Sequence, residues 1–153
     1  ITWALANKGL PVAAGPVVGL QFFPGDTATL YCAVERDIYR STDSGANWSK
    51  VSTLPAAANQ FLISPHDTKL WVASTENQMR RSIDGGQNWL TSATVPLGEG
   101  TVVTGIAADV NNPALITVTA AGTGRGFGVY QVDVVNPGNA IVQRHSAQAF
   151  QIL

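Results

Sequence analysis

The side chains of this sequence best suited to chemistry are its carboxylates, because a glycosidase needs two carboxyl groups roughly 5 to 9.5 Å apart, one of them a proton donor. Asp43 and Asp84 both lie in the pattern Ser-x-Asp-x-Gly-x-Asn-Trp, 41 positions apart. Asp26 and Asp67 recur in a second pattern, Pro-x-Asp-Thr. A carboxylate that recurs with its neighbours belongs to a repeated turn rather than to one reaction centre. The acids that remain as catalytic candidates are Glu35, Asp37, Glu76, Glu99, Asp109 and Asp133.

The repeat extends over the whole chain. Trp48 and Trp89 are followed, after equal intervals, by Leu54-Pro55 and Val95-Pro96, and Trp3 is followed by Leu10-Pro11 one residue later. The stretch "FFPGDTATLY" (22–31) aligns with "ISPHDTKLW" (63–71), which matches Leu30 and Tyr31 with Leu70 and Trp71. A weaker third version is "ADVNNPALI" (108–116). Self-similarity at a fixed period indicates a repeat architecture.

Each repeat contains four short strand-like segments, separated by the Gly, Pro, Asp and Asn residues of tight turns. The expected strands lie near Val17–Phe22, Leu30–Val34, Ile38–Ser41 and Trp48–Ser52, then Gln60–Ile63, Leu70–Ser74, Met79–Ser82 and Trp89–Ser92, then Val103–Ala107, Leu115–Thr119, Val129–Val132 and Ile141–Gln143. Four antiparallel strands every 41 to 45 residues are typical of a β-propeller blade. The predicted fold class is therefore all-β: a β-propeller of about three four-stranded blades, part of a larger ring. The blades are expected at 17–54, 58–95 and 101–145, the last degenerate, with 1–10 as the last strand of a preceding blade.

The pattern Ser-x-Asp-x-Gly-x-x-Trp resembles the Asp-box, or BNR repeat, of sialidases, sortilin-type receptors, xyloglucan-degrading glycosidases and photosystem II assembly factors. The resemblance covers nearly the whole chain as a repeat. It implies a propeller in which each box lies at the outer rim, between the third and fourth strands of a blade. It does not imply one activity, because these families do unrelated things on one scaffold.

The chemistry of the residues explains the spacing of the box. A short Asp side chain can accept hydrogen bonds from the backbone of the turn that it begins, and Gly permits a positive φ. Serine adds a hydroxyl bond, and the tryptophan fills space beside the hairpin. The predicted structural box residues are Ser41, Asp43, Gly45, Trp48, Ser82, Asp84, Gly86 and Trp89. The alternative is that Asp43 and Asp84 are catalytic carboxylates or metal ligands.

The loops between second and third strands, and the links between blades, should share one face of a propeller. Loops on a rigid scaffold are where binding residues concentrate. The candidate binding face contains Glu35, Arg36, Asp37, Glu76, Arg125 and Phe127. The alternative is that these are solvated hairpin tips without a ligand.

Composition excludes several classes of function. The chain has 9 basic and 10 acidic residues, which gives no basic patch for nucleic acid. The sequence contains no run of 18 apolar residues, so direct membrane insertion is not expected. With one cysteine and two histidines, neither a metal site nor a cofactor is expected. We expect an extracytoplasmic location: secreted, periplasmic or cell-surface. Ile1 is compatible with removal of a signal peptide or with an excised fragment.

The sequence favours a non-catalytic binding or scaffold module that mediates protein–protein interaction within a larger assembly. The first alternative is a fragment of a carbohydrate-active glycoside hydrolase, with carbohydrate as its ligand and catalytic residues partly outside this chain. Sialidase chemistry is disfavoured, because the six arginines form no recognisable triad and no Arg-Ile-Pro occurs. The second alternative is an assembly factor or subunit of a membrane complex.

Three four-stranded blades cannot close a ring, because propellers close with about four to eight. Open ends would expose sheet faces and strand edges. The expected partners are therefore the remaining blades of the same propeller or another protein chain.

Overall fold

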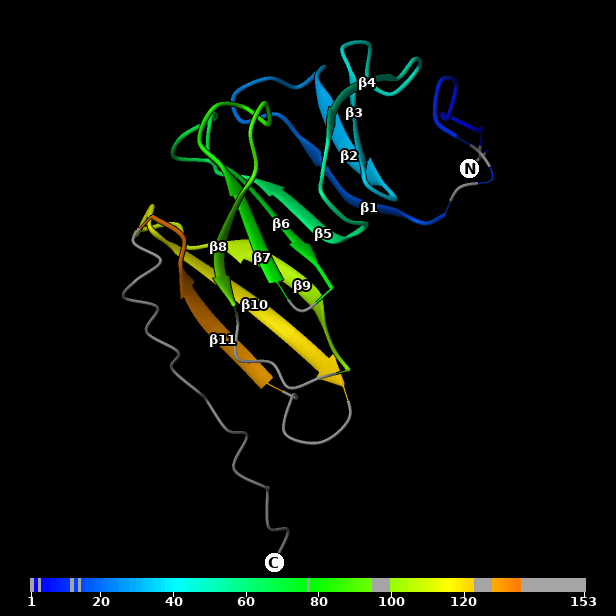
Figure 1. Ribbon diagram of the computed structural model, residues 1–153. Helices are drawn as coiled ribbons and strands as arrows, with labels where there is room; N and C mark the ends of the chain where they lie inside the picture. Colours follow the sequence, from blue (N-terminus) through cyan, green and yellow to red (C-terminus); the bar gives the residue numbers. More distant parts are fainter. Residues whose placement is uncertain are drawn as a thin grey trace, which may run out of the picture.

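The computed structural model describes residues 2, 4–11, 13, 15–76, 78–94, 100–122 and 128–135. In this part of the chain every regular element is a β-strand, and no helix there is long and apolar enough to cross a membrane. The strands form three antiparallel sheets, and the middle sheet lies between the other two (Figure 1). The first sheet has the order β1 (Val17–Phe22), β2 (Leu30–Val34), β3 (Asp37–Ser41), β4 (Ser49–Thr53). The second has the order β5 (Ala58–Ile63), β6 (Trp71–Thr75), β7 (Gln78–Ser82), β8 (Leu90–Thr94), and the third contains β9 (Thr101–Ala108), β10 (Leu115–Gly122) and β11 (Gly128–Asp133).

The predicted all-β class and blade pattern are confirmed. Strand order within each sheet follows chain order, as in a propeller blade. The predicted fourth strand of the third blade, near 141–143, lies outside the described residues. Residues 2 and 4–10, assigned from the sequence to the last strand of a preceding blade, contain no regular strand. The boundaries of the blades as domains remain a prediction.

The register between the first two sheets differs by one residue from the sequence alignment. In the structure Leu30 pairs with Ser41, and Trp71 pairs with Ser82, so Trp71 occupies the place of Leu30 and not of Tyr31. The loops before β2 and β6, residues 23–29 and 64–70, have equal length, so matching Leu30-Tyr31 with Leu70-Trp71 introduces a gap that the structure does not contain. A one-residue shift moves a side chain to the other face of a sheet. Trp71 therefore faces the first sheet.

Apolar clusters between the sheets hold the structure together. Tyr31, Ala33, Ile38 and Leu54 of the first repeat share one cluster with Phe61, Ile63, Trp71 and Ala73 of the second. The Trp71 ring packs edge-on against Tyr31 and Phe61, with ring centroids 5.2 and 5.7 Å apart. A second cluster joins Leu70, Val72 and Met79 to residues of the third sheet, among them Val103, Ile116 and Val118. Between the sheets, apolar side chains are thus buried against those of the neighbouring sheet.

Glutamine side chains link the first strands of neighbouring sheets. The Gln21 side-chain oxygen on β1 accepts a hydrogen bond from the Ile63 backbone N–H at 3.1 Å. Gln60 on β5 donates to the Thr104 carbonyl oxygen of β9 at 3.1 Å. A β-bulge interrupts the pairing of β1, β5 and β9 with their partner strands. Bulges bend a strand and increase its twist, which suits three sheets arranged around a common edge.

Ser74 provides a test of the packing between the second and third sheets. Its buried hydroxyl has no hydrogen-bond partner among the described residues, and the equivalent residue of the first sheet is Ala33. A buried polar group without a partner costs about 1–3 kcal/mol. Ser74→Ala should therefore raise the free energy of unfolding by about 1 kcal/mol, measured by urea denaturation.

The matched control for this prediction is Ser82→Ala. The Ser82 hydroxyl donates to Asp84 and accepts a hydrogen bond from the Gly86 N–H, so its loss should destabilise by about 1–3 kcal/mol. Destabilisation of Ser74→Ala to the same extent as Ser82→Ala would contradict this account of the interface.

Candidate functional site

The first box, Ser41–Trp48, forms a turn in which the carboxylate of Asp43 is surrounded by donors. Its Oδ1 accepts hydrogen bonds from the Ser41 hydroxyl at 2.7 Å and the Asn47 backbone N–H at 2.8 Å. Its Oδ2 accepts from the Asn47 side-chain amide at 2.7 Å. The Ser41 hydroxyl oxygen also accepts from the Gly45 N–H at 2.8 Å. The carboxylate thus closes the turn between β3 and β4.

The second box, Ser82–Trp89, repeats this geometry. Asp84 Oδ1 accepts from the Ser82 hydroxyl at 2.6 Å and from the Asn88 N–H at 2.9 Å, and Oδ2 accepts from the Asn88 amide at 2.7 Å. The asparagine between glycine and tryptophan is therefore part of the turn in both repeats. The sequence alone assigns no role to this asparagine.

These hydrogen bonds favour the ionised carboxylates. The Asn47 amide, with the Asn47 N–H and the Ser41 hydroxyl, lowers the pKa of Asp43 to about 2. The Ser82 hydroxyl, followed by the backbone and side-chain donors of Asn88, lowers the pKa of Asp84 to about 2. A carboxyl group with such a pKa is a poor proton donor near neutral pH.

Gly45 and Gly86 adopt left-handed conformations, with φ of 93° and 84°. A β-carbon at Gly86 would also collide with the Trp71 ring, whereas one at Gly45 would meet only the edge of Trp48 at 3.8 Å. Glycine at these two positions is thus required by the backbone, and at Gly86 also by the packing of Trp71.

The box tryptophans connect each sheet to the segment before it. The Trp89 indole N–H donates to the Ser52 hydroxyl of β4 at 3.0 Å, and Ser52 donates in turn to the Gly86 carbonyl. The Trp48 indole N–H donates to the Ala6 carbonyl at 2.9 Å, and the Trp48 backbone N–H to the Lys8 carbonyl at 2.8 Å. Trp48 is buried, and Trp89 is half-buried.

The hairpin tips of the candidate binding face lie side by side. Glu35 and Glu76 occupy the same position of two-residue turns, β2–β3 and β6–β7, with φ of 53° and 52°. The Ala58 N–H donates to the Glu35 carbonyl at 2.8 Å, and the side-chain amide of the next residue, Asn59, donates to the Glu76 carbonyl at 3.2 Å. Two consecutive residues therefore link the tips of neighbouring sheets, and both glutamates are exposed.

The other predicted face residues have different surroundings. Arg36 is exposed, and its carbonyl accepts from the Leu54 N–H at 2.7 Å. Asp37 is engaged with its own sheet: it pairs with Lys50 at 3.4 Å and accepts from the Thr53 hydroxyl at 2.7 Å. Arg125 and Phe127 lie outside the described residues. Glu35, Arg36 and Glu76 thus have exposed side chains on two hairpin tips whose backbones are linked through Ala58 and Asn59.

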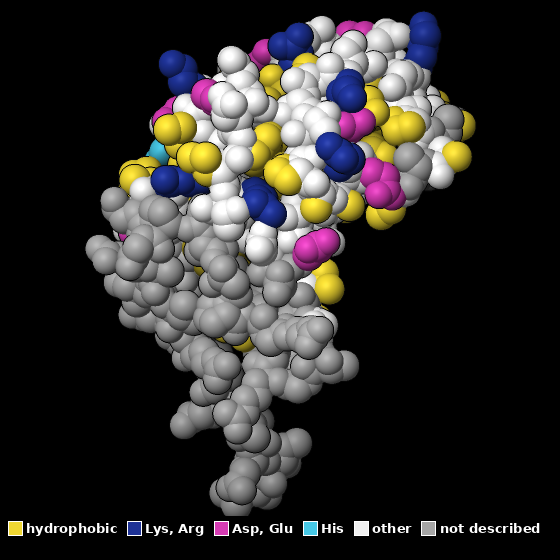
Figure 2. All heavy atoms as spheres, viewed as in Figure 1, with side chains coloured by type: hydrophobic (Ala, Val, Ile, Leu, Met, Phe, Trp, Pro, Cys, Tyr) yellow, Lys and Arg dark blue, Asp and Glu magenta, His cyan; other side chains and the backbone are white. Residues whose placement is uncertain are grey.

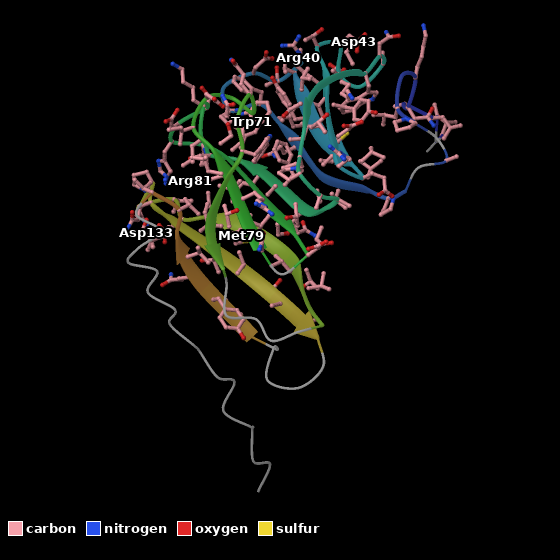
Figure 3. All side chains as sticks on the ribbon, viewed as in Figure 1. Arg40, Asp43, Trp71, Met79, Arg81 and Asp133 are labelled. Atoms are coloured by element: carbon pink, nitrogen blue, oxygen red, sulfur yellow. The ribbon has the colours of Figure 1, made fainter. Side chains whose placement is uncertain are left out.

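Arg81 is a further polar residue with a specific role that the sequence analysis missed. It donates from β7 to the carbonyls of Val134 and Val135, after the end of β11, and Figure 3 shows it beside Asp133. Val134 occupies the place of Asp84 in the third repeat, where the Ser-x-Asp pattern is lost. The one available signal was that Arg40 and Arg81 each precede the serine of a box.

Charge on the surface is mixed in sign. Figure 2 shows Lys and Arg side chains interspersed with Asp and Glu over the part of the face that is described. No group of three or more His, Cys, Asp or Glu side chains that could hold a metal ion occurs among the described residues.

No protein-family profile matches this chain, and no curated protein matches its sequence. Solved structures do match its fold. A GH74 xyloglucanase from Xanthomonas campestris aligns over 94% of this chain and 25% of its own, with TM-score 0.68 and 16% identity. The GH74 enzyme from Niastella koreensis aligns over 77% of this chain and 21% of its own, with TM-score 0.56 and 17% identity. YCF48 bound to a D1 peptide aligns over 82% of this chain and 39% of its own, with TM-score 0.56 and 16% identity.

These matches establish the class of fold. The chain has the architecture of β-propeller blades, and it spans less than half of each matched chain. Xyloglucan-degrading glycosidases and photosystem II assembly factors were among the groups that the repeated motif resembles, so that resemblance is confirmed at the level of fold.

The box carboxylates predict a specific pH dependence of stability. Because their pKa is lowered from 3.8 to about 2, the ionised form favours the folded state; this contribution is present above pH 3.8 and is lost as the pH falls towards 2. Asp43→Ala/Asp84→Ala should therefore melt below the wild type at pH 7, and the two melting temperatures should converge near pH 2. Circular dichroism melts across this range provide the measurement.

Glu76→Gln is the control for this prediction, because the Glu76 contact is made by its backbone carbonyl and survives the substitution. Its melting temperature should track the wild type at every pH. A gap between the Asp variant and the wild type that stays constant down to pH 2 would contradict the role given to the ionised carboxylates.

Proposed function

We propose that this chain is a non-catalytic binding module that holds a protein partner on its hairpin-tip face, defined by Glu35, Arg36 and Glu76. The observation that carries the proposal is the link through Ala58 and Asn59, which joins the backbones of two hairpin tips that each carry an exposed glutamate. Both glutamates have a left-handed backbone, which is unfavourable for residues with a β-carbon. Strained residues on a rigid scaffold are often kept for function.

The boxes have a structural role in this proposal. Asp43 and Asp84 already accept hydrogen bonds on both carboxylate oxygens from their own turns. Their low pKa keeps both carboxylates ionised near neutral pH, so neither can act as the proton donor of a glycosidase. The box residues therefore hold the tips and the sheets in place, and the binding groups lie on the hairpin-tip face.

The nature of the partner follows from the charge of the tips. Two exposed glutamates accompany one exposed arginine, and Asp37 is paired with Lys50. We infer that the partner is a protein segment with more basic than acidic side chains, met outside the cytoplasm. The YCF48 structure, solved with a D1 peptide, supports peptide binding as a use of this fold. A role in assembly of a membrane complex is one form of the same proposal.

The second candidate is part of a glycoside hydrolase, which the alignment of 94% of the chain with a xyloglucanase favours. In that case the catalytic acid pair lies partly outside this chain. Sugar-binding sites commonly contain exposed aromatic rings. Among the described residues Phe22 is the exposed aromatic side chain, and it lies on the first sheet, not at the tips.

Selection of a random peptide library on the immobilised chain tests the proposed function. Recovered peptides should be rich in Lys and Arg, and Glu35→Gln/Glu76→Gln should bind them about tenfold more weakly, because charge complementarity is lost. The matched control is Asp26→Asn, whose carboxylate accepts bonds in the turn before β2, at the other end of the sheet.

Two results would contradict this function. One is equal peptide binding by the glutamate variant and the wild type. The other is release of reducing ends from xyloglucan by the purified chain, abolished by the same glutamate substitutions.

A further inference from the structure

The outer face of the first sheet carries apolar side chains whose counterparts in the other sheets are covered. Val17, Leu20 and Phe22 of β1 lie on this face, and Leu20 and Phe22 are 61% and 57% exposed. The register places Ala58, Phe61 and Ile63 of β5 at the same three positions. Phe61 and Ile63 are 2% and 1% exposed, and all three lie in the cluster between the first and second sheets.

The third sheet repeats the covered arrangement. Val103, Ile106 and Ala108 of β9 occupy these positions, and all three lie in the cluster between the second and third sheets. At two sheet-to-sheet interfaces, then, the three positions pack against the preceding sheet. At the first sheet they do not.

The outer half of the same face is already covered. Leu30, Cys32, Val34, Tyr39 and Trp48 form a buried cluster, against which Leu10 packs. Ala6 and Lys8 accept the hydrogen bonds of Trp48, as Ser52 of β4 accepts that of Trp89. Residues 6–8 thus lie against the first sheet in the position that β4 occupies against the second sheet. No described strand covers the β1 side of this face, where Leu20 and Phe22 are exposed.

We propose that the exposed β1 face, defined by Val17, Leu20 and Phe22, is a docking surface for one further propeller blade. This blade supplies three antiparallel strands that cover the β1 side of the sheet, next to residues 6–8. The two existing interfaces define the chemistry of this partner. The covering side chains are Tyr31, Ala33 and Ile38 in one interface and Leu70, Val72 and Met79 in the other. The partner therefore presents uncharged, apolar side chains from its second and third strands. This surface is separate from the hairpin-tip face, and the proposal does not depend on the function proposed above.

The docking surface is tested by the reactivity of a cysteine placed on it. Leu20→Cys puts a thiol on the exposed face, and Ile83→Cys puts one on the second box, where Ile83 is also 61% exposed. Cys32 is buried, and burial raises the pKa of its thiol to about 11, so it contributes little labelling. In the chain as it stands both new thiols should react rapidly and at the same rate at every protein concentration.

The same variants are then made in a chain with a copy of residues 16–47 placed ahead of residue 3, the tryptophan that the sequence aligns with Trp48. The copy supplies three strands and the following box. Labelling of Leu20→Cys should slow by about tenfold or more, as expected for a group buried in a folded interface, and Ile83→Cys should be unaffected. Unchanged labelling of Leu20→Cys in a folded extended chain would overturn the proposal.

Other occupants of the face give different results, and each of them overturns the proposal. Protection of Leu20→Cys that grows with concentration in the original chain would identify a second copy as the occupant. Protection at all concentrations would show that the chain covers this face itself.

A dye-binding measurement keeps the proposal falsifiable if the extended chain does not fold. The original chain should enhance the fluorescence of a hydrophobic dye. Leu20→Glu/Phe22→Glu should abolish most of this enhancement with an unchanged melting temperature, whereas Ile83→Glu should not. Equal enhancement in both variants would show that the β1 face is not the available apolar surface.

Discussion

Apolar contact between the faces of neighbouring sheets is the interaction on which the rest of this structure depends. A four-stranded sheet of this size has no interior of its own, so Phe61, Trp71 and their neighbours are buried only because the first sheet covers them. The same holds for Met79 and Val118 between the second and third sheets. Removing water from these faces supplies most of the favourable free energy, and this energy is not directional.

Polar contacts at the edges of the sheets determine the relative orientation of neighbouring sheets, which apolar packing alone does not determine. Gln21 and Gln60 link the first strands of consecutive sheets, while Ser52 and Arg81 link the outer ends. Each contact joins a side chain of one sheet to the next sheet in the chain, and most of them end on backbone atoms. Together they fix the angle at which the sheets stack, and therefore the distance between hairpin tips. The placement of Glu35 beside Glu76 is a consequence of this stacking.

Much of this arrangement is predictable from the sequence because it repeats. The bounds of β1 and β2 agree with prediction, and the boxes mark the turns between third and fourth strands. The match of Tyr31 with Trp71 is wrong, because both repeats contain a leucine followed by an aromatic residue, but these pairs lie one position apart in the two sheets. Only strand pairing determines the register. The roles of Asn59 and Arg81 could not be predicted, because each contact joins residues of different sheets. The candidate binding face was proposed from strand order. The link between its tips, however, depends on the bulge of β5 at Ala58 and Asn59, which strand order does not predict.

The box tryptophan connects one sheet to the next, and a double-mutant cycle between Ser52 and Trp89 tests this connection most directly. The Trp89 indole N–H donates to the Ser52 hydroxyl at 3.0 Å across the interface. Unfolding free energies of Ser52→Ala, Trp89→Phe and the double variant should show a coupling of about 0.5–1.5 kcal/mol, the net contribution of one such hydrogen bond. Effects that add to within about 0.3 kcal/mol would show that the two residues act independently, and would contradict the stacking of sheets described here.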